Sequence, residues 1–465
     1  MKYTFFVYFF IFTLLLQGFS QHTADAQTFD AHASSFEQLY QLAIKQNHDV
    51  KVLQETLKVT QEDIGIAATI PNPSLNTYWG WGRQTSVLGN PNQVGLTQTF
   101  ELGPKRKLRT LIAKTILEKE KTGLQQALWL LRSNLRLAYL EYLATVSQTA
   151  QLEKQFVSVN QLIRIAEVRV KAGSSPEADL LQARLVRSQL FPQRIQLEGQ
   201  LAQNRLKLAY FVGEEDPSRL PLSAGSLALL EHIPQWKSFL PQAKEEALIL
   251  SLQNEGLTQR QELKVALKQV DASRLQLKSE KIKRIPDAQV GGGVLFVNTL
   301  SPLSTSNPTA NEKGTFLGGY VTLNVPLPVF DNQEEEIGKA KAQLSTDEKS
   351  VEALTFSIKN SIQQAITGIA TQQRVLDNYR ENLLPQSQEV LRLADLGYRY
   401  GKTGLANVIL ARQACQAIQL DYLLNLGLAW QAWALLEQQT GLPLEGLLLK
   451  LPWEQPTVDF THLRV

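Results

Sequence analysis

The chain has 465 residues, 43% of them hydrophobic, and a formal net charge of +3. This length is ample for a large core and exceeds that of one small domain. The near-neutral charge argues against a nucleic-acid-binding protein, which would carry a strong basic excess. Cys415 is the single cysteine, so no disulfide can form within one chain. We expect Cys415 to be a small packed residue of a helix.

The N-terminus has the pattern of a secretory signal peptide. Lys2 precedes an apolar run at 3–16, and Ala-Asp-Ala at 24–26 has the small-x-small pattern of a cleavage site. We predict a signal peptide over 1–26, cleaved after Ala26. A retained anchor is the alternative, although the apolar run is short for a spanning helix. No cysteine follows the run, so we expect no lipoprotein anchor. No later apolar stretch approaches the roughly 20 residues of a membrane helix.

A first repeat is predicted over 27–212. A helix runs from Phe36 to a proline-rich stop at 71–73. Alternating residues over 74–102 then predict a β-hairpin with one apolar or aromatic face and one small or polar face. This alternation fits a membrane strand or a half-buried soluble hairpin. The residues expected to face lipid are Leu75, Trp79 and Trp81.

A very long helix follows this hairpin. The basic residues at 105–107 are either an anchor at a membrane rim or a solvated helix start. From about Leu108 a helical pattern without proline runs to about Lys171, a length of about 100 Å at 1.5 Å per residue. Such a helix must lie along other helices. A turn near 173–176 leads to a returning helix that ends near Tyr210.

The same order recurs in a second repeat over 241–441. It comprises a helix, a β-hairpin at 288–325 and a long helical hairpin with its tip near 401–405. Pro385 is expected to kink the long helix. Residues 213–240 form a connector between the repeats, and 442–465 form a C-terminal tail.

The two tips keep one register. Three matched pairs are each 228 positions apart: Gly173 and Gly401, Arg184 and Arg412, Gly213 and Gly441. The first helices match at offsets of 213 to 215, so a small insertion lies upstream of Gly401. A constant register over some forty residues indicates a duplication.

Membrane-embedded hairpins would require several copies of the chain. One chain supplies four strands, and an open sheet edge in lipid leaves backbone groups unpaired at several kcal/mol each. Two copies give a barrel of about eight strands, and side chains fill the interior of a barrel of that size. Three copies give about twelve, the smallest number that leaves a usable pore. The hypothesis of export therefore favours a trimer.

Five short motifs stand out: PNPSL at 71–75, QTFELGPKRKLR at 98–109, PLPVFD at 326–331, GKTGLANVILAR at 401–412 and LEQQTG at 436–441. With the order of elements, they resemble the TolC family of outer-membrane efflux proteins, and within it the heavy-metal (CzcC-like) branch. The resemblance covers nearly the whole mature chain.

The resemblance implies a mainly α fold with a small β part. It implies a homotrimeric, long periplasmic α-barrel topped by a 12-stranded transmembrane β-barrel, with an equatorial region made by the connector and the tail. The implied function is a passive exit duct from periplasm to outside in the outer membrane of a Gram-negative bacterium, for metal cations or small toxic compounds. The implied partners are a periplasmic adaptor (membrane fusion protein), an inner-membrane pump of the resistance-nodulation-division type and outer-membrane lipid.

The resemblance also assigns residues to the tips. The adaptor would dock at Gly173, Ser174, Ser175, Pro176, Gly401, Lys402, Thr403, Gly404 and Leu405. The periplasmic aperture would be lined by Asp179, Tyr398 and Asn407. The chain departs from relatives at Asn407 and Leu410, where acidic residues occur, so the mouth is expected to be less negative. Alternatively, Asp179 is a first-turn acid favoured by the helix dipole, and Tyr398 packs between helices.

We find no motif for chemistry. The histidines beyond residue 26 do not pair at metal-ligand spacing, and no nucleophile elbow, Walker or dinucleotide-binding fingerprint occurs. We therefore expect neither a cofactor nor a metal site, and not an enzyme. The alternatives are an outer-membrane duct for drug efflux or type I protein secretion, and a soluble periplasmic coiled-coil adaptor or scaffold.

Overall fold

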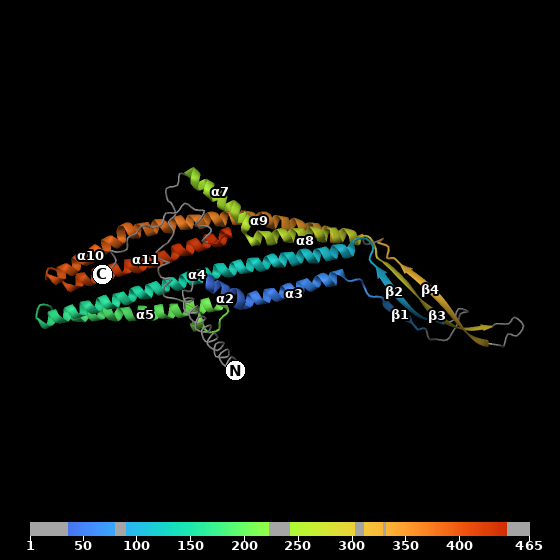
Figure 1. The fold of residues 1–465 in the computed structure, drawn as a ribbon, viewed down its shortest axis with the longest axis horizontal. Coiled ribbons are helices and arrows are strands. Elements are labelled where there is room, and N and C mark those ends of the chain that lie inside the picture. The colour runs from blue at the N-terminus through green and yellow to red at the C-terminus, as the bar shows by residue number, and fades with distance from the viewer. Residues whose placement is uncertain (1–35, 80–89, 223–241, 303–310, 329–331, 444–465) are drawn as a thin grey trace, which may run out of the picture. The chain divides into compact units, whose positions relative to one another are not determined.

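The computed structural model describes residues 36–79, 90–222, 242–302, 311–328 and 332–443 (Figure 1). The predicted signal peptide, Trp81, most of the predicted connector and all but the first two residues of the tail lie outside the described residues. The described part of the chain is mainly helical with one small sheet. The helices are α2 (Phe36–Gln46), α3 (His48–Ala68), α4 (Lys105–Lys171), α5 (Glu177–Val212), α7 (Gln242–Gln259), α8 (Gln261–Lys283), α9 (Glu334–Asn378), α10 (Leu384–Arg399) and α11 (Leu405–Thr440), with a short 3-10 turn at Pro217–Arg219 and a π turn at Tyr379–Leu383.

The described chain divides into two compact units. The strand unit comprises 54–123 and 262–354, with the sheet, α8 and parts of α3, α4 and α9. The tip unit comprises the remaining described residues, including α2, α5, α7, α10 and α11 and the distal parts of α4 and α9.

All strands of the strand unit lie in one antiparallel sheet. The strands are β1 (Ser74–Tyr78), β2 (Asn90–Phe100), β3 (Ala288–Pro302) and β4 (Asn311–Asn324), in the spatial order β1-β2-β3-β4. The hairpins of the two repeats meet where β2 pairs with β3, with Leu96 opposite Gly292. The edges of the four-stranded sheet are therefore β1 and β4.

The basic cluster at the start of α4 is tied to the end of the sheet. Lys105 is 14% exposed and forms an ion pair with Asp287, with Nζ 2.6 Å from Oδ1. The two terminal guanidinium nitrogens of Arg109 donate to the two carboxylate oxygens of Glu101, at 2.6 and 3.3 Å. The Nε of Arg109 donates to the Ala67 carbonyl. Lys105 and Arg109 therefore fasten the helix start to the strand ends, whereas Arg106 and Lys107 are exposed.

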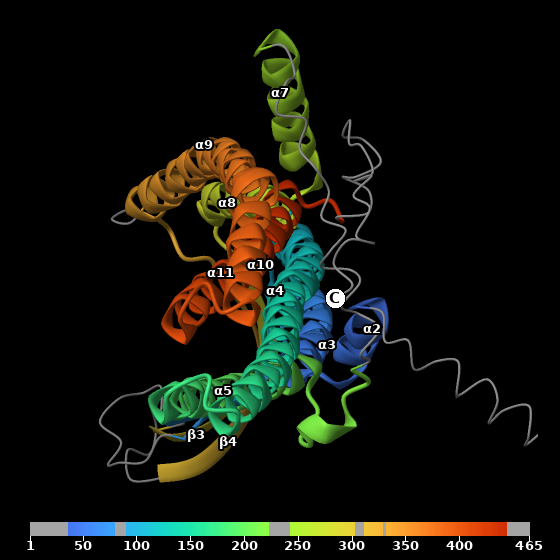
Figure 2. The ribbon, with the colours of Figure 1, turned by 90° about the vertical axis from the view of Figure 1, so that its left-hand side faces the viewer.

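The tip unit contains two helical hairpins, α4–α5 and α10–α11, which extend side by side with their turns at the same end (Figures 1 and 2). Apolar positions at helical spacing on all four helices meet in one buried cluster, which explains why these long helices need one another. The cluster comprises Leu152, Phe156, Val159, Leu162, Ile163, Ala183, Val186, Leu190, Tyr398, Leu405 and Val408.

The duplication is visible in matched helix ends. Helices α5 and α11 are both 36 residues long, and each ends on a left-handed glycine, Gly213 (φ 80°) and Gly441 (φ 71°). Gly213 packs on the break between α2 and α3 at Asn47, and Gly441 packs on the break between α7 and α8 at Arg260. The sequence predicts one helix from Phe36 to the stop at 71–73. The break at Asn47 corrects this, because the Asn47 side chain caps the backbone of Val50.

The π turn marks a change in repeat register. Upstream of it, buried residues of α4 and α9 match at an offset of 227, in the pairs Leu131 and Ile358, Leu135 and Ile362, and Tyr139 and Ile366. Downstream the offset is 228. A π turn accommodates one extra residue in a continuous helix. Part of the insertion upstream of Gly401 therefore lies at Tyr379–Leu383, and Pro385 follows it at the start of α10.

Candidate functional site at the hairpin tips

Both tips are closed by the same backbone motif. In the first, the amide of Gly173 (φ 68°) donates to Val170, and that of Ser174 donates to Arg169 at 2.9 Å. In the second, Gly401 (φ 71°) donates to Tyr398, and Lys402 donates to Gly397 at 2.8 Å. Every donor and acceptor is displaced by 228 positions, so the two turns have the same backbone construction although their side chains differ.

The returning helices also begin alike. The helix caps Pro176 and Gly404 are extended and make no side-chain cap bond. Their carbonyls accept from the amides of Asp179, at 3.1 Å, and Asn407, at 3.2 Å. Asp179 is half-buried and Asn407 is exposed, each in the first turn of its helix. The Asp179 carboxylate therefore lies near the positive end of the α5 dipole.

Most residues assigned to the docking tips are accessible. Gly173, Ser174, Pro176, Gly401, Lys402 and Gly404 are exposed, while Ser175 and Thr403 are half-buried. Leu405 differs, because it is 1% exposed and belongs to the cluster between the hairpins. In the single chain its side chain is not available at a docking surface.

Tyr398 is also internal. It is 2% exposed, and the guanidinium of Arg169 from the first hairpin lies 4.4 Å from its ring centroid. Arg169 also donates to the Tyr398 carbonyl. Among the described residues, the Tyr398 hydroxyl has no hydrogen-bond partner. In the single chain Tyr398 occupies the packing position that the sequence left open as an alternative to the aperture.

A duplicated ion pair lies next to the tips. Arg184 of α5 contacts Glu167 of α4 at 3.1 Å, and Arg412 of α11 contacts Asp395 of α10 at 3.2 Å. Both members of each pair are related by the 228-residue offset. The side chain of Arg412 is only 9% exposed and also contacts Ser158 of the first hairpin, whereas that of Arg184 is 51% exposed. The arginine of this ion pair is thus buried in the second repeat and exposed to solvent in the first.

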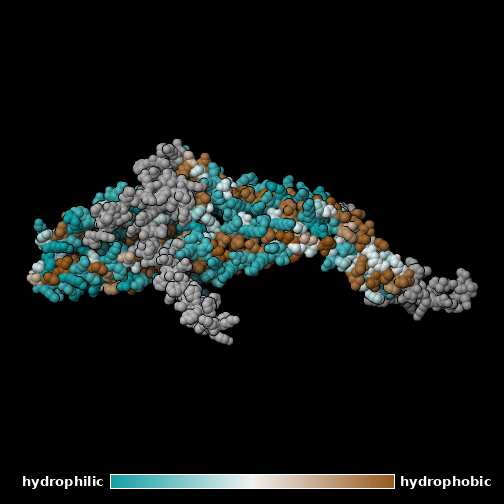
Figure 3. Space-filling model, in the orientation of Figure 1, coloured by the Kyte–Doolittle hydropathy of each residue, from teal (hydrophilic) through white to brown (hydrophobic). Residues whose placement is uncertain are grey.

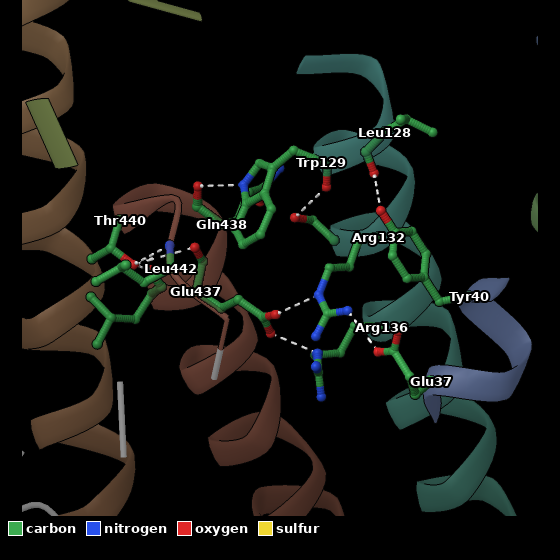
Figure 4. A network of polar contacts seen from close by, with 12 residues as sticks. Glu37, Tyr40, Leu128, Trp129, Arg132, Arg136, Glu437, Gln438, Thr440 and Leu442 are labelled. Atoms are coloured by element: carbon green, nitrogen blue, oxygen red, sulfur yellow. Dashed lines mark hydrogen bonds and ion pairs between the residues drawn. The ribbon is translucent and has the colours of Figure 1, made fainter. Parts of the chain in front are cut away.

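A buried charge cluster, absent from our expectations, joins three helices farther from the tips (Figure 4). Glu437 of α11 is 1% exposed and contacts Arg132 at 3.2 Å and Arg136 at 2.6 Å, both on α4. Arg132 continues to Glu37 of α2 at 2.9 Å. The Arg136 guanidinium lies 4.0 Å from the ring centroid of Phe36. Because these residues are far apart in sequence, helical spacing gave no signal for their pairing.

The contacts of the cluster shift the pKa values of two of its members, Glu37 and Arg132. The hydrogen bond from Gln41 is the largest effect on Glu37 and, with the bond from Arg132, keeps the pKa of this carboxyl below its usual value against the opposing effect of burial. Burial lowers the pKa of Arg132, but Glu37 and Glu437 outweigh it, so the net pKa is raised. The charges of Glu37 and Arg132 are therefore present together at neutral pH.

The exposed surface of the sheet has two chemically different faces. The register places Leu75 beside Leu96 and Leu96 beside Gly292, so alternate residues share a face. Exposed apolar side chains, which gather over the strands in Figure 3, occupy one face: Leu75, Leu96, Phe100, Val290, Val294, Phe296, Leu317, Val321 and Leu323. Trp79, just beyond β1, is exposed as well.

The opposite face is polar and uncharged at the positions whose side chains the structure describes. Besides glycines and Leu295, it carries Ser74, Asn76, Tyr78, Gln93, Thr97, Thr99, Gln289, Tyr320, Thr322 and Asn324. Asn76 donates to Thr97 at 2.6 Å. A Cβ on Gly95 would lie 2.3 Å from the Tyr320 hydroxyl, so glycine there lets the tyrosine lie across the strands.

The described residues lack two further kinds of feature. They contain no group of three or more His, Cys, Asp or Glu side chains placed to hold a metal ion. None of their helices combines the length and apolar character needed to cross a membrane.

The long paired hairpins, the duplicated tips and the two-faced sheet define a duplicated helical-hairpin protein. The family model for outer membrane efflux proteins matches residues 39–214 and 252–442. The chain therefore belongs to the outer membrane efflux protein family.

One curated protein and several solved structures are similar to the chain over most of its length. The cobalt-zinc-cadmium resistance protein CzcC of Cupriavidus metallidurans is 22% identical over 426 residues, covering 90% of this chain and 91% of CzcC. A membrane protein from Pseudomonas aeruginosa has a TM-score of 0.69 at 17% identity, covering 89% of this chain and 94% of the other. CusC, described for its transmembrane channel formation, has a TM-score of 0.68 at 16% identity, covering 88% and 92%. The outer membrane protein VceC of Vibrio cholerae has 0.66 at 16%, covering 87% and 96%.

Proposed function

We propose that this protein is the outer-membrane component of a tripartite efflux system, a passive exit duct from the periplasm to the outside of a Gram-negative bacterium. The observation that carries the proposal is the two-faced sheet. Its exposed large apolar side chains lie on one face, which also carries the exposed Thr77, and the other face is uncharged and mostly polar. That arrangement suits strands with lipid on one side and water on the other.

The open edges of this sheet support assembly from several copies. Edges in lipid leave backbone groups without partners, at several kcal/mol each. With β1 and β4 at the edges, neighbouring copies pair β4 of one chain with β1 of the next. Three copies complete a barrel of about twelve strands around an aqueous lumen, whereas about eight strands leave an interior that side chains fill.

The tips are the proposed meeting point with the partner proteins. Their exposed turns, Gly173–Pro176 and Gly401–Gly404, dock a periplasmic adaptor, which links the duct to an inner-membrane pump of the resistance-nodulation-division type. Asp179 and Asn407 line the aperture from the first turns of α5 and α11, and Tyr398 supports it from within. The energy for transport comes from the pump, since a passive duct needs no catalytic group.

The proposed cargo is metal cations or small toxic compounds. The similarity to CzcC, a cobalt-zinc-cadmium resistance protein, supports metal ions as the first class to test. A deletion strain loses resistance to the cargo and regains it with the intact gene. Growth in graded cobalt, zinc and cadmium, beside a panel of drugs, separates metal from drug efflux.

Membrane fractionation tests the duct against a soluble scaffold. The duct stays in the outer-membrane fraction after washing with high salt and with urea, because its apolar face is buried in lipid. As a matched pair, Val321→Asp places a charge on the apolar face, and Thr322→Asp places one on the polar face. We expect only Val321→Asp to reduce membrane insertion. Release of the native protein by salt alone would show a scaffold.

Conductance in planar bilayers tests the aperture. We expect Asp179→Asn to lower the preference for cations over anions, and Asn407→Asp to raise it, because each change alters the charge at the mouth. Glu198→Gln, an exposed charge farther along α5, is the control. An unchanged ion preference in both aperture variants would place the narrow point elsewhere.

A further inference from the structure

The ends of α4 and α8 that adjoin the sheet carry basic side chains in excess. Every acidic residue of the segments 101–109 and 280–287 already has a basic partner. The pairs are Glu101–Arg109, Asp287–Lys105 and Glu280–Lys283, with N–O distances of 2.6 to 2.8 Å. Arg106, Lys107 and Lys281 are exposed and form no ion pair with any residue that the structure describes. We call these three residues the basic patch.

The two segments that carry the basic patch lie against each other. The backbone amide of Leu102 donates to the carboxylate of Asp287 at 3.2 Å. A Cβ built on Gly103 would lie 3.5 Å from Cδ1 of Ile285. Helix α4 follows β2 and α8 precedes β3, and these two strands are neighbours in the sheet (Figure 1). The basic patch is therefore built by both repeats at the same end of the sheet.

The duplicated fold does not account for this charge. The first turn of α4 contains no acidic residue, although the helix dipole favours acidic and disfavours basic residues there. The corresponding helix of the second repeat, α9, begins with glutamates at 334–336. Helix α8 ends with Lys281 and Lys283, whereas α3 of the first repeat has no basic residue in its last turn. The basic patch thus belongs to one place on the chain and is not a general property of the helix ends.

The basic patch borders the apolar face of the sheet. Phe100, at the end of β2, is 51% exposed on that face. Leu102 and Ile285 lie in the chain between the strands and the basic residues, and they are 41% and 42% exposed. At a membrane surface, apolar side chains enter the hydrocarbon while long basic side chains extend to the polar headgroups. The change from apolar to basic residues at the strand ends fits such a boundary.

We propose that the basic patch binds the headgroups of anionic phospholipids at the periplasmic surface of the outer membrane. This rests on the proposed function, because the end of the sheet meets headgroups only when the strands lie in the membrane. The apolar face then lies in the hydrocarbon, and Arg106, Lys107 and Lys281 donate hydrogen bonds to lipid phosphates beside it. Arginine and lysine both bind phosphate through charge-assisted hydrogen bonds.

Native mass spectrometry of the purified full-length mature protein with its bound lipids tests this contact. The protein is reconstituted in vesicles of equal parts phosphatidylglycerol, which is anionic, and phosphatidylcholine, which has no net charge. It is then extracted gently, and the retained lipids of each kind are counted. We expect the native protein to retain phosphatidylglycerol in preference. Arg106→Gln, Lys107→Gln and Lys281→Gln together lower this preference at least about fivefold, the change that about 1 kcal/mol per basic residue gives at an anionic surface.

Two controls separate the basic patch from total charge and from misfolding. A charge-matched variant neutralises exposed lysines outside the patch, Lys45, Lys51 and Lys154, and keeps the lipid preference. Arg106→Lys with Lys281→Arg keeps the charge of the patch and also keeps the preference. Circular dichroism checks the helix content of each variant. Where the triple variant loses helix content, the single substitutions of the patch are compared instead.

The outcomes distinguish this proposal from the proposed function. Equal retention of the two lipids by the native protein, or an unchanged preference in the triple variant, overturns the headgroup contact and leaves the duct standing. A changed ion preference of the bilayer conductance in the triple variant also overturns it, because the basic patch would then face the lumen. A protein that inserts into vesicles of neither lipid overturns the contact and the proposed function together.

Discussion

The side-chain amide of Asn47 donates to the carbonyl of Phe211, with the two atoms 2.9 Å apart. This bond joins the break between α2 and α3 to the end of α5, where Gly213 lies against the backbone of Gln46. In the second repeat, Arg260 at the α7–α8 break contacts Gln439 near the end of α11, at 3.2 Å. The duplication therefore preserves a joint between a helix end and a helix break.

The joint predicts that alanine costs more stability at one left-handed glycine than at another. A Cβ on Gly213 would lie 2.7 Å from the Gln46 carbonyl oxygen, whereas a Cβ on Gly173 would meet nothing within 4 Å. We expect Gly173→Ala to cost about 1 kcal/mol for the positive φ alone. Gly213→Ala adds a backbone clash and costs about 2–4 kcal/mol. Urea unfolding followed by circular dichroism measures both, and equal losses would contradict the proposed joint.

The buried charge cluster predicts unequal roles for its two carboxylates. Glu437→Gln leaves Arg132 and Arg136 without their shared counter-charge and is expected to cost roughly 3–5 kcal/mol. Glu37→Gln removes a carboxylate that is 54% exposed and is expected to cost below about 1 kcal/mol. Both variants are compared by denaturant unfolding at pH 7. Similar losses of stability in the two variants would show that burial does not determine how much each carboxylate of this cluster contributes to the free energy of unfolding.

The lowered pKa of Glu37 predicts a small loss of stability in acid. A carboxyl with a depressed folded-state pKa stabilises the protein above its unfolded pKa, about 4.5, and loses this contribution as pH falls through the folded value. Between pH 5 and pH 3 the native protein should therefore lose more stability than Glu37→Gln. The difference is below about 1 kcal/mol because the side chain is partly exposed. Parallel pH profiles of the two proteins would contradict the assignment.

Tyr398 offers a test of packing against aperture lining. Its hydroxyl has no hydrogen-bond partner among the described residues, so Tyr398→Phe should change stability by less than about 0.5 kcal/mol. Tyr398→Ala empties a buried site and should cost about 3–5 kcal/mol. Unfolding and bilayer conductance are measured for both. A changed conductance in Tyr398→Phe, without a change in stability, would show that the hydroxyl faces the pore.

The long helices were predictable from sequence because their apolar periodicity is local, and the constant offset between Gly173 and Gly401 indicated matching tips. Side-chain partners from distant helices were not predictable. The pairing of Glu437 with Arg132, and of Lys105 with Asp287, depends on which helix faces approach one another. The burial of Leu405 and Tyr398 depends on the contact between hairpins, which a single helix pattern does not encode. The π turn could not be predicted from the sequence, because its five residues resemble those of an ordinary α-helix.

The mass of the purified protein in detergent tests the central claim most directly, because one chain supplies a four-stranded sheet with two open edges. Light scattering or native mass spectrometry, corrected for bound detergent, should give three copies of the mature chain, with β-structure retained in circular dichroism. A stable monomer with the same β-structure would contradict the duct.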